Sequence, residues 1–264
     1  MSTIVLIHGL WMTPRSWEHW IDRYGAAGHT VLAPAWPGME AEVEELNRDP
    51  SPIARLTISA ILDHYDAIIR ALDEPPIIMG HSFGGTFTQV LLDRGLGSAG
   101  VAIDSAQVKG VMKLPLATLR STFPVLGNPA NRNRAVPLTP DQFHYAFTNS
   151  LSEEESLAVY RRYHVPAAGH VLFEGALANF NPRAATRVHF DNSDRAPLLF
   201  ISGGQDHVIP ESINAENVRR YHKSGALTEH EVYPDRTHYT LGQDGWEKVA
   251  DHALSWALEH ARAS

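Results

Sequence analysis

The chain has 264 residues, of which 44% are hydrophobic and 20% are charged, as in an ordinary soluble globular protein. Its 22 basic and 30 acidic residues give a net charge of −8, which argues against nucleic acid or an anionic membrane as a partner. The absence of cysteine excludes disulfides, thiolate metal sites and a cysteine nucleophile. The N-terminus carries no signal-peptide pattern and no apolar run is long enough to cross a bilayer, so we expect a cytoplasmic protein.

Short apolar runs rich in β-branched residues predict six strands, and turn signals or helical patterns follow them. The strands are expected at residues 3–7, 28–34, 77–79, 100–104, 197–203 and 229–233. Helices are expected from Thr13-Pro14 to Tyr24, at 57–72, directly after Ser82, at 210–223 and at 246–261. An acidic loop is expected at 40–52. This alternation predicts an α/β fold with a doubly wound, mainly parallel sheet.

The alternation breaks between residues 107 and 195, where no convincing buried strand occurs. Thr139 and Ser152 each begin a capping-box pattern, so helices are expected there. We therefore divide the chain into a core of residues 1–106 and 196–264 and a helical cap of residues 107–195. A separate small helical domain is the alternative, but ligands bind at the end of such sheets where the strands finish, which favours a cap over that end.

The central motif is Gly80-His81-Ser82-Phe83-Gly84, which follows an apolar strand and precedes a helical run. Gly-x-Ser-x-Gly in this context is typical of a sharp strand-to-helix turn that exposes a nucleophilic serine. Glycine is needed at both ends of the motif because a Cβ would collide with a neighbouring strand or helix. We predict that Ser82 is the nucleophile; the alternative is a glycine-rich turn with a surface serine.

A serine nucleophile needs a base and an acid that orients the base. Position selects His238 among fifteen histidines, because it follows the last strand and precedes the last helix. Asp206 lies in a Gly-rich turn directly after the fifth strand and is the predicted acid. Asp104 is a weaker rival for that role, and Asp235 has the pattern of a turn residue after proline.

The oxyanion hole is predicted to use the backbone N–H groups of Phe83, at the start of the helix after Ser82, and of Leu10, after the first strand. Trp11 would shape the substrate pocket, although it could be a core residue. The other residues that we expect to bind substrate are aromatic side chains of the cap and neighbours of the acid and base: Phe143, Phe147, Phe173, His207 and Tyr239.

No His-Glu-x-x-His, dinucleotide-binding or P-loop motif occurs, so neither a metal nor a cofactor is predicted. The expected partner is a small-molecule substrate. Oligomeric state is left open.

The strand before His8-Gly9, the Gly-His-Ser-Phe-Gly-Gly turn, Gly203-Gly204-Gln205-Asp206 and the late His238 together resemble the α/β-hydrolase superfamily over nearly the whole chain outside the insertion. The compact branch with plant-type esterases and hydroxynitrile lyases is the most similar. The resemblance implies the spatial strand order 2-1-3-4-5-6, numbered along the chain. The loop Pro34–Gly38 departs from the family pattern and is expected to have its own shape.

Hydroxynitrile lyases carry Thr and Lys where this chain has Gly9 and Tyr239, and this difference favours hydrolysis. We expect a serine hydrolase that cleaves an ester, thioester or lactone of a small to medium, largely apolar substrate. Two alternatives are a non-hydrolytic enzyme, such as a lyase or a catalyst of cofactor-free oxygen or peracid chemistry, and a ligand-binding receptor.

Overall fold

The computed structural model describes residues 1–262 and contains a six-stranded parallel sheet with the order β2-β1-β3-β4-β7-β8. This order and the parallel pairing confirm the predicted fold class and strand arrangement. The four central strands are buried almost throughout, whereas the edge strands are partly exposed. Their bounds are Thr3–Ile7 (β1), Thr30–Leu32 (β2), Ile77–His81 (β3), Ala99–Ile103 (β4), Leu198–Gly203 (β7) and Thr228–Tyr233 (β8).

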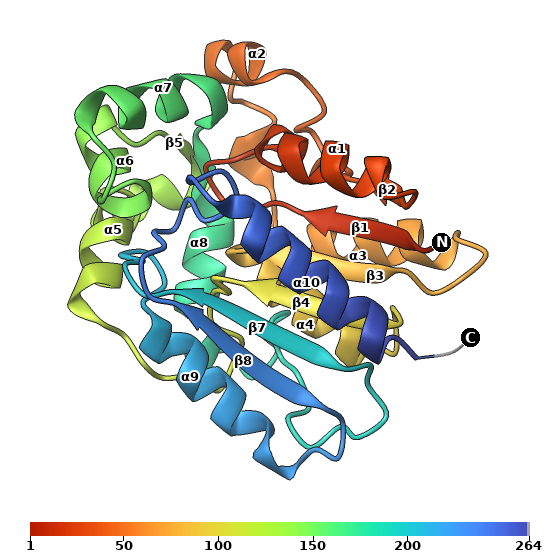
Figure 1. The fold of residues 1–264 in the computed structure, drawn as a ribbon. Helices are drawn as coiled ribbons and strands as arrows, with labels where there is room; N and C mark the ends of the chain where they lie inside the picture. Colours follow the sequence, from red (N-terminus) through yellow and green to blue (C-terminus); the bar gives the residue numbers. More distant parts are fainter. Residues whose placement is uncertain (263–264) are drawn as a thin grey trace.

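Helices cover both faces of the sheet (Figure 1). One core cluster packs against one face of the sheet and contains Trp17, Trp20, Tyr24 and the apolar side of α10. The second cluster lies on the opposite face and includes the apolar sides of α3 and α4 and Ile213 of α9. The helix bounds are Glu18–Ala26 (α1), Ile58–Arg70 (α3), Phe83–Asp93 (α4), Glu211–Arg220 (α9) and Trp246–His260 (α10).

The predicted acidic loop at residues 40–52 contains a short helix, α2, at Val43–Arg48, so that prediction was incomplete. Val43 and Leu46 are buried one turn apart, and acidic residues in the first turn and Arg48 in the last turn complement the helix dipole. The helix predicted from Thr13 begins instead with a 3₁₀ turn at Pro14–Trp17 before α1.

Residues 107–195, which we call the insertion segment, carry four helices: Leu116–Leu126 (α5), Pro140–Phe147 (α6), Glu153–Tyr163 (α7) and Gly169–Ala176 (α8). These helices lie beyond the carboxyl ends of the strands, on the left of Figure 1. Both predicted capping boxes are present at the starts of α6 and α7. Two strands of two residues each, β5 (Ala135–Val136) and β6 (Ala167–Ala168), pair antiparallel within the segment and were too short to predict.

The last part of the insertion segment runs back toward the start of β7. The backbone N–H and Nδ1 of His189 both bond Asp93 Oδ2, at the end of α4, at 3.1 and 2.9 Å. Within the described residues, no helix combines the length and apolar character needed to span a membrane.

Candidate active site

Ser82 occupies the sharp turn between β3 and α4 with φ 57° and ψ −119°, a conformation that non-glycine residues rarely adopt. A Cβ on Gly80 would lie 2.0 Å from the carbonyl oxygen of Gly84, and a Cβ on Gly84 would lie 2.0 Å from that of Ile7. Both contacts are with backbone, which cannot move aside as a side chain can. Glycine is therefore required on each side of Ser82. The backbone at Gly80 packs directly against that at Gly84, and the backbone at Gly84 packs directly against β1.

His238 and Asp206 are joined by a hydrogen bond of 2.6 Å between Nδ1 and Oδ2, and both side chains are fully buried. The other carboxylate oxygen of Asp206 accepts the N–H groups of Val208 and Ile209 at 2.7 and 2.8 Å. These two donors fix the orientation of the carboxylate, so that its Oδ2 faces Nδ1 of His238 and accepts the proton on that nitrogen. Nε2 of His238 is then the nitrogen that can accept a proton.

His81, next to Ser82 in the motif, fixes the backbone of His238. Its Nε2 donates to the carbonyl oxygen of His238 at 2.8 Å, and the two ring centroids are 4.6 Å apart. Burial lowers the pKa of His81, so its ring is neutral. The loop that carries His238 is thus attached directly to the Ser82 turn.

Nε2 of His238 has no hydrogen-bond partner among the described residues, and it does not reach Ser82 Oγ at hydrogen-bonding distance. Bonds between a catalytic nucleophile and its base are often formed only in the complex with substrate. The ring of Phe147 meets the His238 ring edge-to-face with the centroids 4.8 Å apart, which limits how the imidazole can turn. Nε2 is therefore unengaged and held in one orientation.

Asp104, the rival acid, does not bond His238. Its Oδ1 accepts the N–H of Gly203 at 2.7 Å, while its Oδ2 lies 3.9 Å from Nε2 of His81 and has no partner among the described residues. Burial, reinforced by the charge on Asp206, raises the pKa of this carboxyl. Asp235 is exposed on its turn. Of the three acids considered from sequence, Asp206 is the one that the structure brings to His238.

Ligand-type atoms of His81, Asp104 and His238 lie within 4.8 Å of one another and could in principle surround a metal ion. A metal ion there would compete with the two bonds that hold these rings, from His81 to the His238 carbonyl and from His238 to Asp206. The cluster fits a positioning network better than a metal site.

The loop after β1 is braced by His8. Its Nδ1 donates to the Gly9 carbonyl at 3.0 Å, its Nε2 accepts the N–H of Trp36 at 3.3 Å, and its ring stacks on the Trp36 indole. Burial lowers the pKa of His8 to about 4, so this neutral pattern holds at pH 7. The unusual Pro34–Gly38 loop thus supports the loop that bears Leu10.

Gly9 packs against Ser82, because a Cβ on it would lie 2.6 Å from Cβ of Ser82. Within residues 1–262, the backbone N–H groups of Leu10 and Phe83 donate to no protein acceptor. Phe83 begins α4, so its N–H lies at the positive end of the helix dipole. Two donors are therefore free beside Ser82.

A cleft of about 240 Å³ opens at Ser82 between α5 and α8, with walls that are mostly apolar. Trp11 is the one predicted substrate-binding residue in its lining. Ser82 and Phe83, which were predicted in other roles, also line the cleft. The wall residues that were not predicted include Val111, Thr118, Thr122, Leu126, Leu172, Gly175, Asn179, Val208 and Ile209.

Phe147 and Phe143 lie behind the cleft. Phe147 is buried between the rings of Trp11 and His238, and Phe143 stacks on Phe147 with the centroids 4.7 Å apart. Phe173 is half-buried on α8 and packs against the second core cluster, the one that includes the apolar sides of α3 and α4. These three side chains support the site and its neighbours and do not line the cleft, which corrects the roles expected from their aromatic character.

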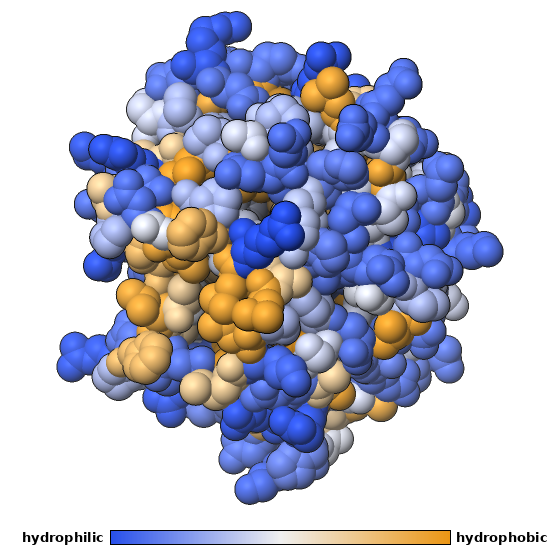
Figure 2. Space-filling model, turned by 90° about the vertical axis from the view of Figure 1, so that its left-hand side faces the viewer, coloured by the Kyte–Doolittle hydropathy of each residue, from blue (hydrophilic) through white to orange (hydrophobic). Residues whose placement is uncertain are grey.

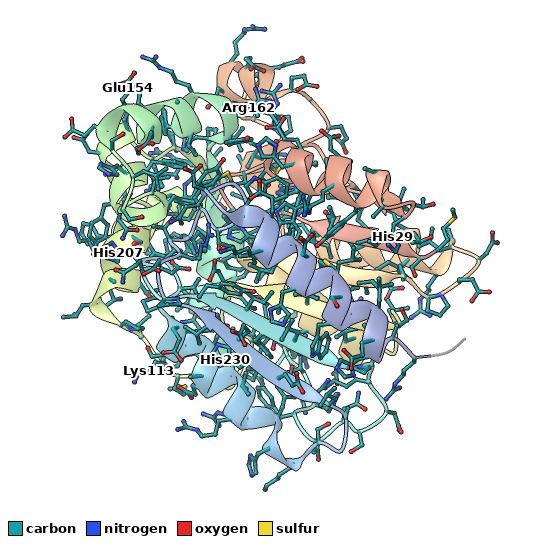
Figure 3. The ribbon with its side chains drawn as sticks, viewed as in Figure 1. His29, Lys113, Glu154, Arg162, His207 and His230 are labelled. Atoms are coloured by element: carbon teal, nitrogen blue, oxygen red, sulfur yellow. The ribbon has the colours of Figure 1, made fainter. Side chains whose placement is uncertain are left out.

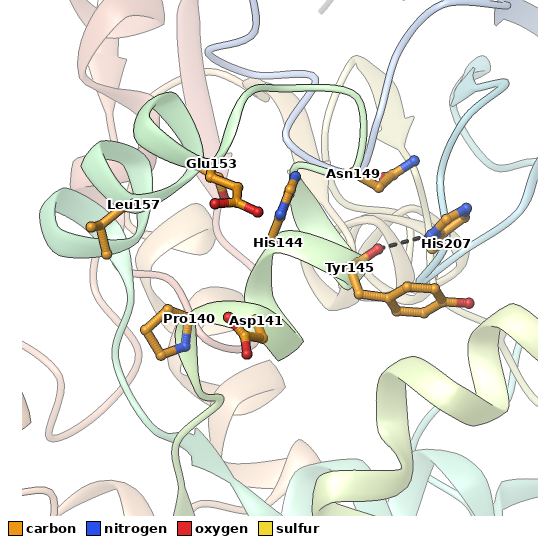
Figure 4. Close-up of a pocket in the computed structure, with 9 residues that line it drawn as sticks. Pro140, Asp141, His144, Tyr145, Asn149, Glu153, Leu157 and His207 are labelled. Carbon is orange, nitrogen blue, oxygen red and sulfur yellow. Dashed lines mark hydrogen bonds between the residues drawn. The ribbon is translucent and has the colours of Figure 1, made fainter.

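His207 and Tyr239 lie outside the cleft as well. His207 is at the outer edge of the molecule (Figure 3), where its Nδ1 bonds the carbonyl of Tyr145 at 2.8 Å beside a polar depression on α6 and α7 (Figure 4). Tyr239 is buried against Tyr163, and its backbone N–H donates to the carbonyl of Phe147 at 3.0 Å. Both residues follow a catalytic candidate in sequence, but the backbone turns their side chains away from Ser82.

Comparison with known proteins shows the family of the chain. The model of the alpha/beta hydrolase family matches residues 4–252. The chain belongs to the alpha/beta hydrolase family. No curated protein matches the sequence of this alpha/beta hydrolase.

Solved structures share the fold at low sequence identity. One is an extracellular alpha/beta-hydrolase from a Paenibacillus species, with a TM-score of 0.69, 19% identity and coverage of 100% of both chains. Another is a methylesterase from Arabidopsis, with a TM-score of 0.68, 13% identity and coverage of 98% of this chain and 100% of that one. Polyneuridine aldehyde esterase has a TM-score of 0.66 and 16% identity over 97% and 99% of the two chains.

Proposed function

We propose that this alpha/beta hydrolase is a serine hydrolase that cleaves a carboxylic ester, thioester or lactone through an acyl-enzyme. Ser82 attacks the carbonyl carbon while Nε2 of His238 takes the hydroxyl proton and passes it to the leaving group. Asp206 keeps the imidazole in the tautomer that this step requires. The observation that carries the proposal is the buried 2.6 Å bond between His238 and Asp206, in a loop that His81 ties to the Ser82 turn.

The free N–H groups of Leu10 and Phe83 would stabilise the oxyanion of the tetrahedral intermediate. After the leaving group departs, His238 would remove a proton from water, which then attacks the acyl carbon and regenerates Ser82. The mechanism uses side chains and backbone alone. No cofactor takes part in it.

The cleft argues for a medium-sized, largely apolar substrate. Its volume of about 240 Å³ and its aliphatic walls from α5 and α8 suit a hydrocarbon chain or ring next to the scissile bond. Hydrolysis is preferred over lyase chemistry because no side chain fits at Gly9, where a Cβ would lie 2.6 Å from Cβ of Ser82, and because Tyr239, which follows His238, points away from the cleft.

The test is release of p-nitrophenol from p-nitrophenyl esters of increasing acyl length, measured for the wild type and for Ser82→Ala. We expect turnover by the wild type alone, with the highest kcat/KM at a medium chain length. Circular dichroism of Ser82→Ala checks that the fold is intact. Equal rates for the two folded proteins would contradict the proposal.

A further inference from the structure

Exposed apolar side chains gather at the mouth of the Ser82 cleft. Among the residues that the structure describes, eleven large apolar side chains are exposed, and seven of them belong to the insertion segment. Figure 2, which views the molecule from the insertion side, shows an apolar patch there. We call these seven residues the apolar rim: Met112, Leu114, Leu116, Leu119, Phe123, Leu177 and Phe180.

The apolar rim continues into the cleft. Met112, Leu114, Leu119 and Phe180 line the cleft and are nevertheless between 42% and 81% exposed. Apolar side chains therefore extend from the exposed rim into the cleft that contains Ser82. An apolar substrate that enters at the rim would contact them along its path.

Helix α5 carries apolar residues on its outer side. Thr118, Thr122 and Leu126 face the cleft at intervals of four residues, while Leu116 and Phe123, two turns apart, are 84% and 69% exposed. A surface helix normally places polar residues on its solvent side. Apolar residues there, contiguous with others, mark an interaction surface.

The charge of this region is opposite to that of the whole protein. Residues 105–140 contain five basic and no acidic residues, and residues 175–190 contain Arg183 and Arg187 and no acidic residue, although the chain has a net charge of −8. Lys113 lies between two rim residues, and Arg120 follows Leu119. The five basic residues of the first stretch are Lys109, Lys113, Arg120, Arg132 and Arg134.

The loop at the centre of the rim is held in place. The carboxylate of Glu216, on α9, accepts the N–H groups of Met112 and Lys113 at 3.1 and 2.9 Å. Glu216 is itself paired with Arg220 at 3.0 Å, and this pairing partly offsets the negative charge of Glu216. Met112 and Leu114 are thus presented to solvent on a fixed backbone.

We propose that the apolar rim docks onto an anionic lipid surface and draws apolar substrate from it into the cleft. Interfacial segments of proteins combine apolar and cationic side chains in this way, because the apolar groups enter the acyl boundary while the cations contact the headgroups. The local excess of cations outweighs the expectation, drawn from net charge alone, that the protein has no membrane partner. Docking itself does not depend on the proposed hydrolysis, whereas delivery of substrate does.

The experiment is co-sedimentation of the Ser82→Ala protein, chosen so that lipid turnover plays no part, with two kinds of vesicle. One is phosphatidylcholine alone, and the other is phosphatidylcholine mixed with phosphatidylglycerol. We expect binding to the mixed vesicles that weakens as salt is added. Replacing Leu116 and Phe123 with Ser should weaken binding at least about tenfold, and Lys113→Ala about fivefold.

The matched control is Leu258→Ser, which replaces a leucine that is 42% exposed on α10, and it should bind like the parent protein. The variant with Ser at 116 and 123, made with Ser82 intact, should hydrolyse a water-soluble p-nitrophenyl ester at the wild-type rate, which shows that it is folded. No binding to the mixed vesicles, or an equal loss in Leu258→Ser, would overturn the proposal. So would dimerisation through the rim in sedimentation velocity, since a second copy would then cover it. Vesicle binding without any ester hydrolysis would refute the proposed function and leave the docking inference intact.

Discussion

The two sides of the Ser82 cleft are built in different ways. On the core side, a Cβ on Gly80 or Gly84 would collide with backbone, and a Cβ on Gly9 would collide with Cβ of Ser82. On the insertion side, mostly apolar side chains of α5 and α8 form the wall. The core side therefore determines where the reacting groups lie. The wall that α5 and α8 form can change in shape and size without moving Ser82 or His238.

The largest expected effect concerns the acid on the core side. Asp206→Asn should lower kcat by about 10⁴-fold, because the amide no longer holds the His238 proton on Nδ1. Asp104→Asn is the matched control. It should retain activity within about tenfold, because Asp104 bonds Gly203 and not His238. The measurement is steady-state hydrolysis of the best p-nitrophenyl ester, and equal losses in the two variants would make Asp104 the functional acid.

The next effect compares one glycine from each side of the cleft. In Gly84→Ala the new Cβ would meet the backbone of Ile7 at 2.0 Å, so we expect a loss of about 3 kcal/mol in the free energy of unfolding. Urea denaturation followed by circular dichroism measures this loss.

Gly175→Ala is its counterpart on the insertion side, where the new Cβ would meet the Phe83 ring at 2.7 Å. The ring can turn aside, and alanine favours the helix, so stability should change by no more than about 1 kcal/mol. The optimum acyl length should become shorter instead. A stable Gly84→Ala protein, or an unfolded Gly175→Ala protein, would contradict the expected difference between the two sides of the cleft.

A smaller effect concerns two buried histidines, His8 in the core and His164 in the insertion segment. Burial lowers the pKa of each from 6.5 to about 4, and Nε2 of each accepts a backbone N–H. Between these values the unfolded chain binds more protons than the native chain, so stability falls as the pH falls from 6.5 to 4. When the pH falls from about 7 to about 5, each histidine should lower the free energy of unfolding by about 2 kcal/mol.

Urea denaturation at the two pH values, for the wild type and for His8→Gln and His164→Gln, measures these contributions separately. Each variant should be less stable than the wild type at pH 7 and should lose less stability on acidification. An unchanged pH dependence in either variant would show that its histidine is not buried in the neutral form.

The sheet and the core side of the cleft could be predicted because their signals are local in sequence. Each buried strand is a continuous apolar run, and the close contacts at Gly80 and Gly84 leave a motif of five residues. Asp206 and His238 were selected by their places after consecutive strands, and parallel strands bring such loops to one edge of the sheet. The helix α2 was missed because six residues with two buried side chains give a weak periodic signal.

The insertion side could not be predicted in detail, because its contacts depend on how separate helices dock. Thr118, Thr122 and Leu126 share one face of α5, and this spacing could have indicated a packed helix. It could not have indicated a cleft wall rather than a core face. Aromatic character was a misleading guide, since Phe143 and Phe147 are buried behind the cleft. His207 was expected to bind substrate because it directly follows Asp206. Neighbouring residues of a loop can point in opposite directions, and the side chain of His207 lies outside the cleft.

The central claim is that Ser82 is a nucleophile activated by His238. Its most direct test is the intact mass, with peptide mapping, of the protein after reaction with a fluorophosphonate, which phosphonylates an activated serine irreversibly with loss of fluoride. The account predicts one adduct, on Ser82, that is absent from Ser82→Ala and forms far more slowly in His238→Ala. A folded wild-type protein that gains no adduct, or gains it on another residue, would contradict the account.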